Sequence, residues 1–356
     1  MPPLPPDPSP GGEASDPALA LTNDHPVLRH FWFPVARADE VGSLPTRVEV
    51  AGHDVVLART DDGLLALPDA CSHRGAPLSL GTVDAGCVVC PYHGWRFAAD
   101  GRCESIPALG DGPVPPRAHL TSHRVTERYG LVWVCLDEPW APLPEIPEWD
   151  QPGRTCTVLK REVWRASTGL MLENLLDMAH LPLLHASTLG DPGDVSGEVL
   201  GRSEHGFAFA YDQLAADETG DVKPRKVRYD VQAPFVLRTS FSYPGVERVA
   251  FGLLLPVSHG RTQIFGLTVR SGGADWDAFQ AFEDKVVEED RWLMEALADR
   301  PLHLDRTVEV HTVADRAALE LRRMWRGYVD RYLGTEAPLP TTPAPTTDTE
   351  VPDGPH

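Results

Sequence analysis

The chain has 356 residues, and its 32 lysines and arginines stand against 52 aspartates and glutamates, so that the formal net charge is −20. This acidic balance argues against nucleic acids and anionic membrane surfaces as partners, because both are bound through basic surfaces. The length suggests two domains, each large enough for a core of its own.

The two ends of the chain are poor in apolar residues. Residues 1–25 are rich in proline, and residues 336–356 are rich in proline and threonine, so we predict a disordered tail at each end. We expect no secretory signal at the amino terminus and find no apolar run long enough to cross a membrane. The chain has six cysteines, and two of them belong to the metal motif described below. We therefore expect no disulfide framework, which is consistent with a cytoplasmic protein.

From residue 26 to about residue 145 the sequence is typical of short strands separated by turns. Residues 47–71 alternate apolar and polar side chains, and Gly52 and Gly63 interrupt the alternation at positions suited to hairpin turns. Residues 123–136 predict another strand pair. We therefore predict a small antiparallel β domain over residues 26–145.

Two cysteine–histidine pairs lie between these strands. The first is Cys71 with His73, and the second is Cys90 with His93. Two thiolates and two imidazoles on paired short loops suit a Rieske [2Fe–2S] cluster, in which one iron takes both cysteines and the other takes both histidines. The alternative is a Cys2His2 zinc site, but zinc ligands are usually spaced as Cys–Cys and His–His pairs, whereas each pair here is mixed. The remaining cysteines show no second metal spacing and are expected to be free thiols: Cys87, Cys103, Cys135 and Cys156.

The proline-rich residues 139–149 mark the boundary to a second domain, which we place at residues 146–335. Its predicted elements are a helix over residues 167–184, a series of strands, and two further helices over residues 276–300 and 313–333. An antiparallel sheet packed against a long carboxy-terminal helix is an α+β architecture.

A group of polar residues lies near the end of the first predicted helix. Asn174, Asp177 and His180 are three residues apart and therefore share one helical face. His185 follows five residues after His180, a separation of about 140° that would turn the two rings apart on a straight helix. Pro182 lies between them and removes a backbone donor, so we predict a kink that brings both imidazoles to one point.

Two histidines and a distant carboxylate form the facial triad of mononuclear non-haem Fe(II) sites, which leaves one face of the metal open for O2 and substrate. The candidate carboxylates all lie in the helix predicted at residues 276–300. By composition each of them could equally be a solvated surface acid, because exposed acids often cluster on helices. The candidates are Asp284, Glu288, Glu289 and Asp290.

Together these motifs resemble the oxygenase component of Rieske non-haem iron oxygenases, of the type that includes vanillate demethylase. The resemblance covers about residues 25–335. The text VVEEDRWLMEA is similar to the helix that carries the third iron ligand in this family, and the matching position is Asp290. The resemblance rests on two intact motifs, Cys71-x-His73…Cys90-x-x-His93 and Asn174-x-x-Asp177-x-x-His180-x4-His185.

The resemblance implies a Rieske domain followed by a catalytic domain of helix-grip type, in which a twisted antiparallel sheet surrounds a long helix. It implies His180, His185 and Asp290 as the ligands of a mononuclear Fe(II), with Asn174 near the iron but not bound to it. The cluster would be held by Cys71, His73, Cys90 and His93.

The resemblance also implies a head-to-tail homotrimer, in which the cluster of one subunit faces the iron of the next. Asp177 would bridge the two centres by accepting hydrogen bonds from His93 of the partner subunit and from His180 of its own chain. Bonds of this kind fix the orientation of ligand rings. Electrons would come from NAD(P)H through a separate reductase or ferredoxin, because the chain lacks a glycine-rich dinucleotide motif.

By analogy with this family, the implied reaction is hydroxylation or oxidative O- or N-demethylation of a small aromatic or cyclic molecule. An aromatic-ring dioxygenase and an electron-transfer or ligand-binding module without oxygenase activity are the alternatives. Phe241, Tyr243 and Phe251 are candidate pocket residues, although aromatic residues in strands belong more often to the core.

Overall fold

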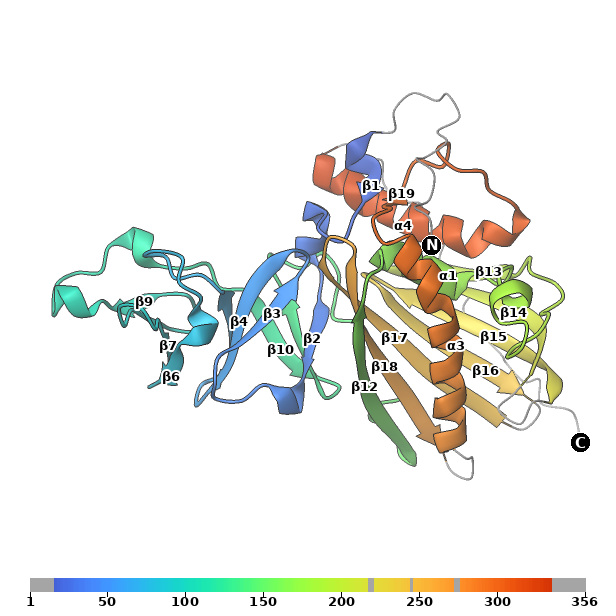
Figure 1. Ribbon diagram of the computed structural model, residues 1–356, viewed down its shortest axis with the longest axis horizontal. Coiled ribbons are helices and arrows are strands. Elements are labelled where there is room, and N and C mark those ends of the chain that lie inside the picture. Colours follow the sequence, from blue (N-terminus) through green and yellow to red (C-terminus); the bar gives the residue numbers. More distant parts are fainter. Residues whose placement is uncertain (1–15, 217–220, 244–245, 272–275, 335–356) are drawn as a thin grey trace, which may run out of the picture.

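The computed structural model describes residues 16–216, 221–243, 246–271 and 276–334. Figure 1 shows a strand-rich part on the left, formed by the first part of the chain, and on the right a large sheet with helices over one face and one end. This arrangement confirms the predicted α+β fold, in which a small antiparallel β domain precedes a domain of sheet and long helices.

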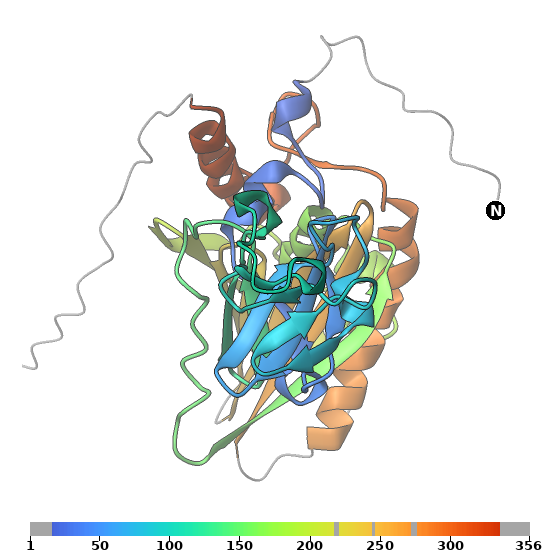
Figure 2. The same cartoon turned by 90° about the vertical axis from the view of Figure 1, so that its left-hand side faces the viewer.

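The left-hand part contains three small antiparallel sheets, and the predicted hairpins are present. Gly52 and Gly63 lie in the turns with φ of 78° and 121°, a region that favours glycine because it has no Cβ. The sheets are β10 (Arg124–Arg128), β11 (Leu131–Cys135) and β2 (Phe33–Arg37); β3 (Thr46–Val50), β4 (His53–Thr60) and β5 (Gly63–Pro68); and β6 (Thr82–Asp84), β7 (Cys87–Val89), β8 (Arg96–Phe97) and β9 (Cys103–Ser105). Figure 2 looks onto this end of the molecule.

The right-hand part is a seven-stranded antiparallel sheet in the order β12-β18-β17-β16-β15-β14-β13. The five strands from β14 to β18 are paired in sequence order. The edge strand β12 precedes the first predicted helix and is not among the predicted elements. The strands are β12 (Arg154–Trp164), β13 (Glu198–Ser203), β14 (Gly206–Ala216), β15 (Val222–Gln232), β16 (Val236–Tyr243), β17 (Val246–Ser258) and β18 (Arg261–Ser271).

Two long helices accompany this sheet, α3 (Trp276–Ala296) and α4 (Arg316–Leu333). Figure 1 shows α3 lying along the face of the sheet, whereas α4 lies across its upper end together with α1 (Thr168–Leu176). The helix that the sheet surrounds is therefore α3, and the last helix of the chain closes the end of the domain.

The predicted helix over residues 167–184 is broken, but not at its proline. α1 ends at Leu176, and Asp177 is extended with φ −88° and ψ 138°. The carboxylate of Asp177 accepts the backbone N–H groups of Ala179 at 2.9 Å and His180 at 3.1 Å, which stabilises the turn. Pro182 lies in the first turn of the next helix, α2 (Leu181–Leu184), where the missing N–H costs nothing. The prediction of a proline kink is wrong in position, because the side chain of Asp177 ends the first helix.

One hydrophobic core runs through both parts of the molecule. Phe31, just before β2, packs edge-to-face on Trp325 of α4 with ring centroids 5.2 Å apart, and Phe33 of β2 stacks on Phe235 in the turn between β15 and β16. A second, separate cluster that includes Phe97 lies under the two metal loops. The metal loops therefore lie on a small core that they share with one face of β4 and β5, while the other face of these strands belongs to the core that continues into the sheet domain.

The amino-terminal tail was predicted to reach residue 25, and this is wrong for residues 16–25. β1 (Ala20–Leu21) pairs with β19 (Leu302–His303), and Asn23 is 3 % exposed. The side chain of Asn23 donates to the carbonyls of Ala166 at 3.1 Å and Arg261 at 2.9 Å, and accepts the N–H of Thr168 at 2.8 Å. Asn23 therefore caps α1 from a distant part of the chain, which a local reading of composition does not detect. The rest of the predicted tails, residues 1–15 and 336–356, lies outside the described residues.

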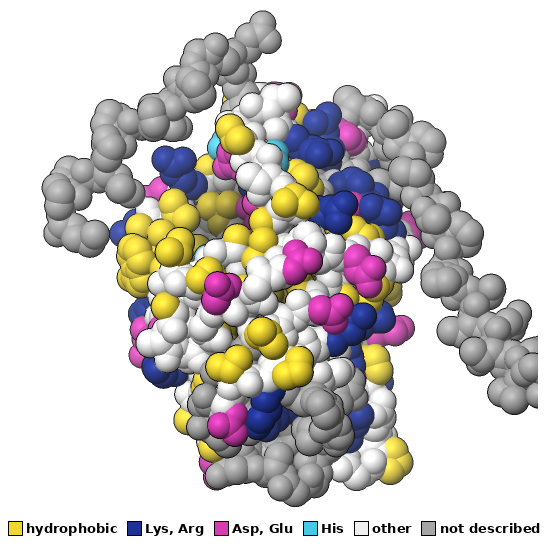
Figure 3. All heavy atoms as spheres, turned by 90° about the vertical axis from the view of Figure 1, so that its right-hand side faces the viewer, with side chains coloured by type: hydrophobic (Ala, Val, Ile, Leu, Met, Phe, Trp, Pro, Cys, Tyr) yellow, Lys and Arg dark blue, Asp and Glu magenta, His cyan; other side chains and the backbone are white. Residues whose placement is uncertain are grey.

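The surface is mixed in character. On the face shown in Figure 3, acidic and basic side chains are interspersed with hydrophobic ones. The most exposed large hydrophobic residues include Leu183 at 81 % and Val310 at 94 %. Within the described residues, no helix combines the length and the apolar composition that crossing a bilayer requires.

Candidate metal centres and the adjoining cavity

The two metal loops have the same backbone design. In each loop the N–H of the cysteine, Cys71 or Cys90, donates to the carbonyl five residues later, at 2.9 and 2.8 Å. A glycine four residues after each cysteine donates its N–H back to the cysteine carbonyl, at 2.8 and 3.1 Å. These glycines, Gly75 and Gly94, both have φ of 69°, where a side chain would be strained. Each loop is thus held in shape by its own backbone.

The structure brings the cysteines together and the histidines together, although the sequence mixes them. Cys71 and Cys90 are 3 % and 2 % exposed, and burial, together with the neighbouring thiol of Cys90, raises the pKa of Cys71 to about 11. His73 and His93 are exposed, and their Nδ1 atoms lie 3.2 Å apart. A buried thiol pair beside an exposed imidazole pair fits a Rieske cluster, in which each iron takes one like pair.

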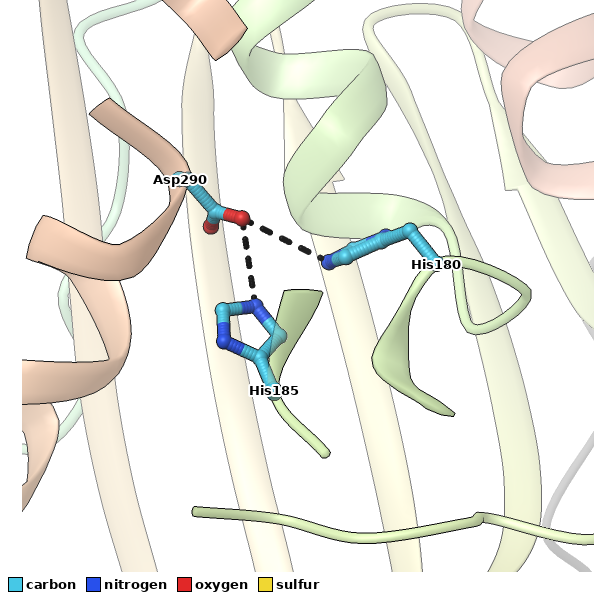
Figure 4. Close-up of side chains that lie close together, drawn as sticks. All are labelled: His180, His185 and Asp290. Carbon is cyan, nitrogen blue, oxygen red and sulfur yellow. Dashed lines mark ion pairs between the residues drawn. The ribbon is translucent and has the colours of Figure 1, made fainter. Parts of the chain in front are cut away.

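His180 and His185, at the two ends of α2, converge with Asp290 of α3, and Figure 4 shows the three side chains pointing toward one another. One potential ligand atom from each lies within 4.8 Å of the other two. Oδ1 of Asp290 is 3.1 Å from Nε2 of His185 and 3.7 Å from Nε2 of His180. This oxygen is buried and makes no hydrogen bond, so it is left for a cation. Two imidazoles and one carboxylate are the donor set of a mononuclear iron site.

Of the four candidate acids on α3, only Asp290 points its carboxylate between the histidines. It is 5 % exposed. Asp284 accepts a hydrogen bond from Gln280 at 2.8 Å, and Glu288 is an exposed partner of Arg291. The resemblance therefore selected the acid that the structure brings to the site.

The fourth acid, Glu289, contacts His185 from the other side, with Oε2 2.8 Å from Nδ1. Asp177 contacts Nδ1 of His180 at 3.0 Å in the same way. Burial lowers the pKa of His185, but the carboxylates of Asp290 and Glu289 outweigh it, so the pKa of His185 is raised above its usual value. The partner role of Glu289 was not predicted, because it depends on a contact between residues that are distant in the sequence.

A cavity of about 130 Å³ adjoins the triad, between α3 and the strands β16, β17 and β18. Phe241 and Phe251, predicted as pocket residues, line it, while the side chain of Tyr243 lies outside the described residues. Most lining side chains are apolar. The polar ones are Asn174, Thr239, Thr268, Gln280, Glu283 and Asp290.

The cavity borders the triad at Asp290, which lines it. A second hollow of about 120 Å³ shares Asn174, Phe241 and Asp290 with the first, and is also lined by His180 and His185. Asn174 lines the same hollow as the triad. A ligand in the cavity would lie next to Asp290, and one that reached the second hollow would also lie next to His180 and His185.

Two known protein families match the chain. The family described as Rieske [2Fe-2S] domain matches residues 31–122, and the family described as Vanillate O-demethylase oxygenase C-terminal domain matches residues 164–331. The first match contains both metal loops, and the second contains the triad.

Two enzymes of Pseudomonas putida are similar over most of their length. Methylxanthine N1-demethylase NdmA is 31 % identical, over 86 % of this chain and 91 % of that protein. Methylxanthine N3-demethylase NdmB is 28 % identical, over 85 % of this chain and 90 % of that protein. The solved structure of NdmA with caffeine superimposes with a TM-score of 0.76 at 27 % identity, covering 88 % and 94 % of the two chains. Dicamba monooxygenase bound to 3,6-dichlorosalicylic acid shares the fold, with a TM-score of 0.72 at 21 % identity over 86 % and 98 %.

Proposed function

Because this chain belongs to the Rieske non-haem iron oxygenases, we propose that it is a terminal oxygenase that hydroxylates or oxidatively demethylates a small ring compound. The observation that carries the proposal is the apolar cavity lined by Asp290, together with the adjoining hollow that His180, His185 and Asp290 line. The demethylase names of NdmA and NdmB support demethylation over ring dihydroxylation.

The wall of the cavity leaves room for a ring substrate. Gly252 of β17 and Gly266 of β18 lie directly opposite each other in the sheet and both line the cavity. A Cβ at either position would make an ordinary contact of 3.8 Å with a leucine side chain, and neither glycine has a positive φ. The backbone would therefore accept a side chain at both positions, and the glycines leave that space to a ligand. Gln280 accepts from Thr268 at 2.7 Å and donates to Asp284, which fixes its amide in the cavity wall as a polar contact for the substrate.

We assign the metal-binding residues from their geometry and from the family pattern. Cys71 and Cys90 would hold one iron of the cluster, and His73 and His93 the other. His180, His185 and Asp290 would hold the mononuclear iron. When bound, the cluster supplies electrons and the iron supplies oxygen activation. The chain itself binds the substrate, orients its methyl or ring carbon toward the triad, and excludes water with apolar walls.

We further propose that the chain works as a homotrimer. In Figure 1 the metal loops next to β6, β7 and β9 lie at the far left, away from α3, so the two centres of one chain are not neighbours. A hollow of about 430 Å³ opens at Asp177 and His180 and is bordered by the exposed Val310. It offers a place for the exposed His93 of the partner subunit, with Asp177 as the bridge between His93 and its own His180.

Hydrogen bonds hold Asp177 in this role. Burial raises the pKa of Asp177, but hydrogen bonds from the His180 ring and from backbone N–H groups outweigh it, and the net pKa is lowered, which favours a carboxylate that accepts bonds. A separate reductase or ferredoxin would deliver electrons from NAD(P)H. None of the six cysteines forms a disulfide, and we place the protein in the cytoplasm.

The test is a single turnover of dithionite-reduced protein with O2 and a panel of N-methyl and O-methyl ring compounds. Demethylation puts one oxygen atom into the methyl C–H bond and reduces the other to water, so formaldehyde should equal demethylated product. A cis-diol instead would identify a ring dioxygenase. Binding without any product, from protein with a filled iron site, would favour the electron-transfer or ligand-binding alternative.

A further inference from the structure

The imidazole of His185 lies between consecutive acids of α3. Nε2 lies 3.1 Å from Asp290, and Nδ1 lies 2.8 Å from Oε2 of Glu289. The ring is 1 % exposed, so water does not compete for either nitrogen. When Nδ1 carries the proton and donates it to Glu289, the lone pair of Nε2 is left for a metal.

Glu289 is itself held in place by Thr188. The hydroxyl of Thr188 donates to Oε1 of Glu289 at 2.5 Å, and the backbone N–H of Thr188 donates to the carbonyl of His185 at 2.9 Å. His185, Glu289 and Thr188 therefore form a closed ring of contacts between α3 and the residues after α2. Thr188 is 6 % exposed, so this ring lies in the interior.

We infer that Glu289 is a positioning residue for the mononuclear metal, which fixes the tautomer and orientation of His185 and is fixed in turn by Thr188. This inference rests on the proposed function, since it assigns Glu289 to the same iron site. A histidine ligand commonly donates its second ring N–H to a carboxylate, and loss of that partner lowers metal affinity by about 10–100-fold.

Glu289 differs from Asp177, the partner of His180, in what else it touches. Asp177 also borders the hollow in which we place the cluster of the partner subunit, whereas Glu289 lines neither that hollow nor the substrate cavity. Its loss should therefore weaken metal binding without removing a contact to the substrate or to the partner subunit.

The experiment measures Co(II) binding to protein whose mononuclear metal has been removed and whose cluster is intact. Cobalt is chosen because it is counted separately from the cluster iron. Glu289→Leu removes the acceptor at nearly constant volume, and Glu289→Gln keeps one acceptor oxygen. Glu288→Gln is the matched control, because Glu288 is the preceding acid on α3 and its side chain is 62 % exposed beside Arg291.

We expect Glu289→Leu to weaken Co(II) binding by about 10–100-fold, Glu289→Gln to weaken it less, and Glu288→Gln to leave it unchanged. Unchanged Co(II) affinity in Glu289→Leu, with the cluster intact, would overturn the inference. A different result would be that Co(II) binding to the wild-type protein is absent, or is the same in His185→Ala. In that case the proposed iron site itself would be wrong.

Thr188 supplies a second test that leaves the carboxylate in place. Thr188→Val removes the hydroxyl while keeping the shape, and should lower Co(II) affinity by a smaller factor; Thr188→Ser should restore it. If Glu289→Leu does not fold, these two Thr188 variants still test whether Glu289 positions His185. Equal, wild-type affinity in Thr188→Val and Thr188→Ser would contradict the anchoring of Glu289 by Thr188.

Discussion

The two metal loops take their shape from backbone hydrogen bonds that span four or five residues, whereas the triad draws His180 and His185 from the α1–α2 region and Asp290 from α3. The loops also rest on a small core of their own, while the triad depends on the large core and on the packing of α3 against the sheet. The first centre should therefore respond to changes within its loops, and the second to changes far away in the sequence.

The largest expected effect comes from Cys90→Ser, which removes a buried ligand of the cluster. We expect the protein to lose its acid-labile sulfide and to fall from about three irons per chain to about one, with the mononuclear iron retained, because the two centres are built independently. Cys156→Ser is the control, since this half-buried thiol lies outside the loops. Loss of both centres in Cys90→Ser would show that the triad depends on the cluster loops.

Asp290→Ala is the converse change. Removing the buried carboxylate should empty the mononuclear site and abolish turnover, while about two irons and two sulfides per chain and the EPR signal of the reduced cluster remain. Glu288→Gln should keep all of the iron. A changed cluster signal in Asp290→Ala would mean that the two centres are coupled in their assembly.

The same contrast explains what could be predicted from the sequence. The hairpins, the metal loops and the two histidines depend on local spacing, and the sequence displays that spacing directly. Asp290 could be chosen among its neighbours only through the resemblance, because all four acids have the same composition signal. The contacts of Glu289 with His185 and Thr188 join residues about a hundred positions apart, and no local pattern encodes them.

The break after α1 shows a second reason for failure. Pro182 is the stronger helix-breaking signal, yet the helix ends at Asp177, whose side chain binds the following N–H groups. The side chain of Asp177 takes N–H groups that would otherwise bond to carbonyls of a continuing helix, and which acceptor wins depends on the surrounding structure. The prediction therefore had the right segment and the wrong residue.

Asn23→Ala tests whether the amino-terminal segment stabilises the triad through α1, and we expect an effect of intermediate size. It removes the cap of α1 and leaves buried carbonyls without their donor, so the free energy of unfolding should fall by about 2 kcal/mol and the Tm by roughly 5 °C. Asp24→Ala, at an exposed neighbouring position, should change the Tm little. The expected decrease in mononuclear iron, with the cluster unchanged, would show that the amino-terminal segment supports the triad alone; an equal loss of both centres would contradict this.

Gly75→Ala is the smallest change and tests the loops by themselves. Because φ is 69° and nothing lies within 4 Å of the added Cβ, the cost is backbone strain alone, about 1 kcal/mol. Gly42→Ala is the matched control, since Gly42 also has open space around its Cβ position but no positive φ, and it should be neutral or slightly stabilising. Faster loss of the cluster on heating in Gly75→Ala, with mononuclear iron retained, would confirm that the loop backbone holds the cluster. If both variants lose the cluster at the wild-type rate, the glycine conformation is not what stabilises the loop, and the small core beneath it becomes the main support.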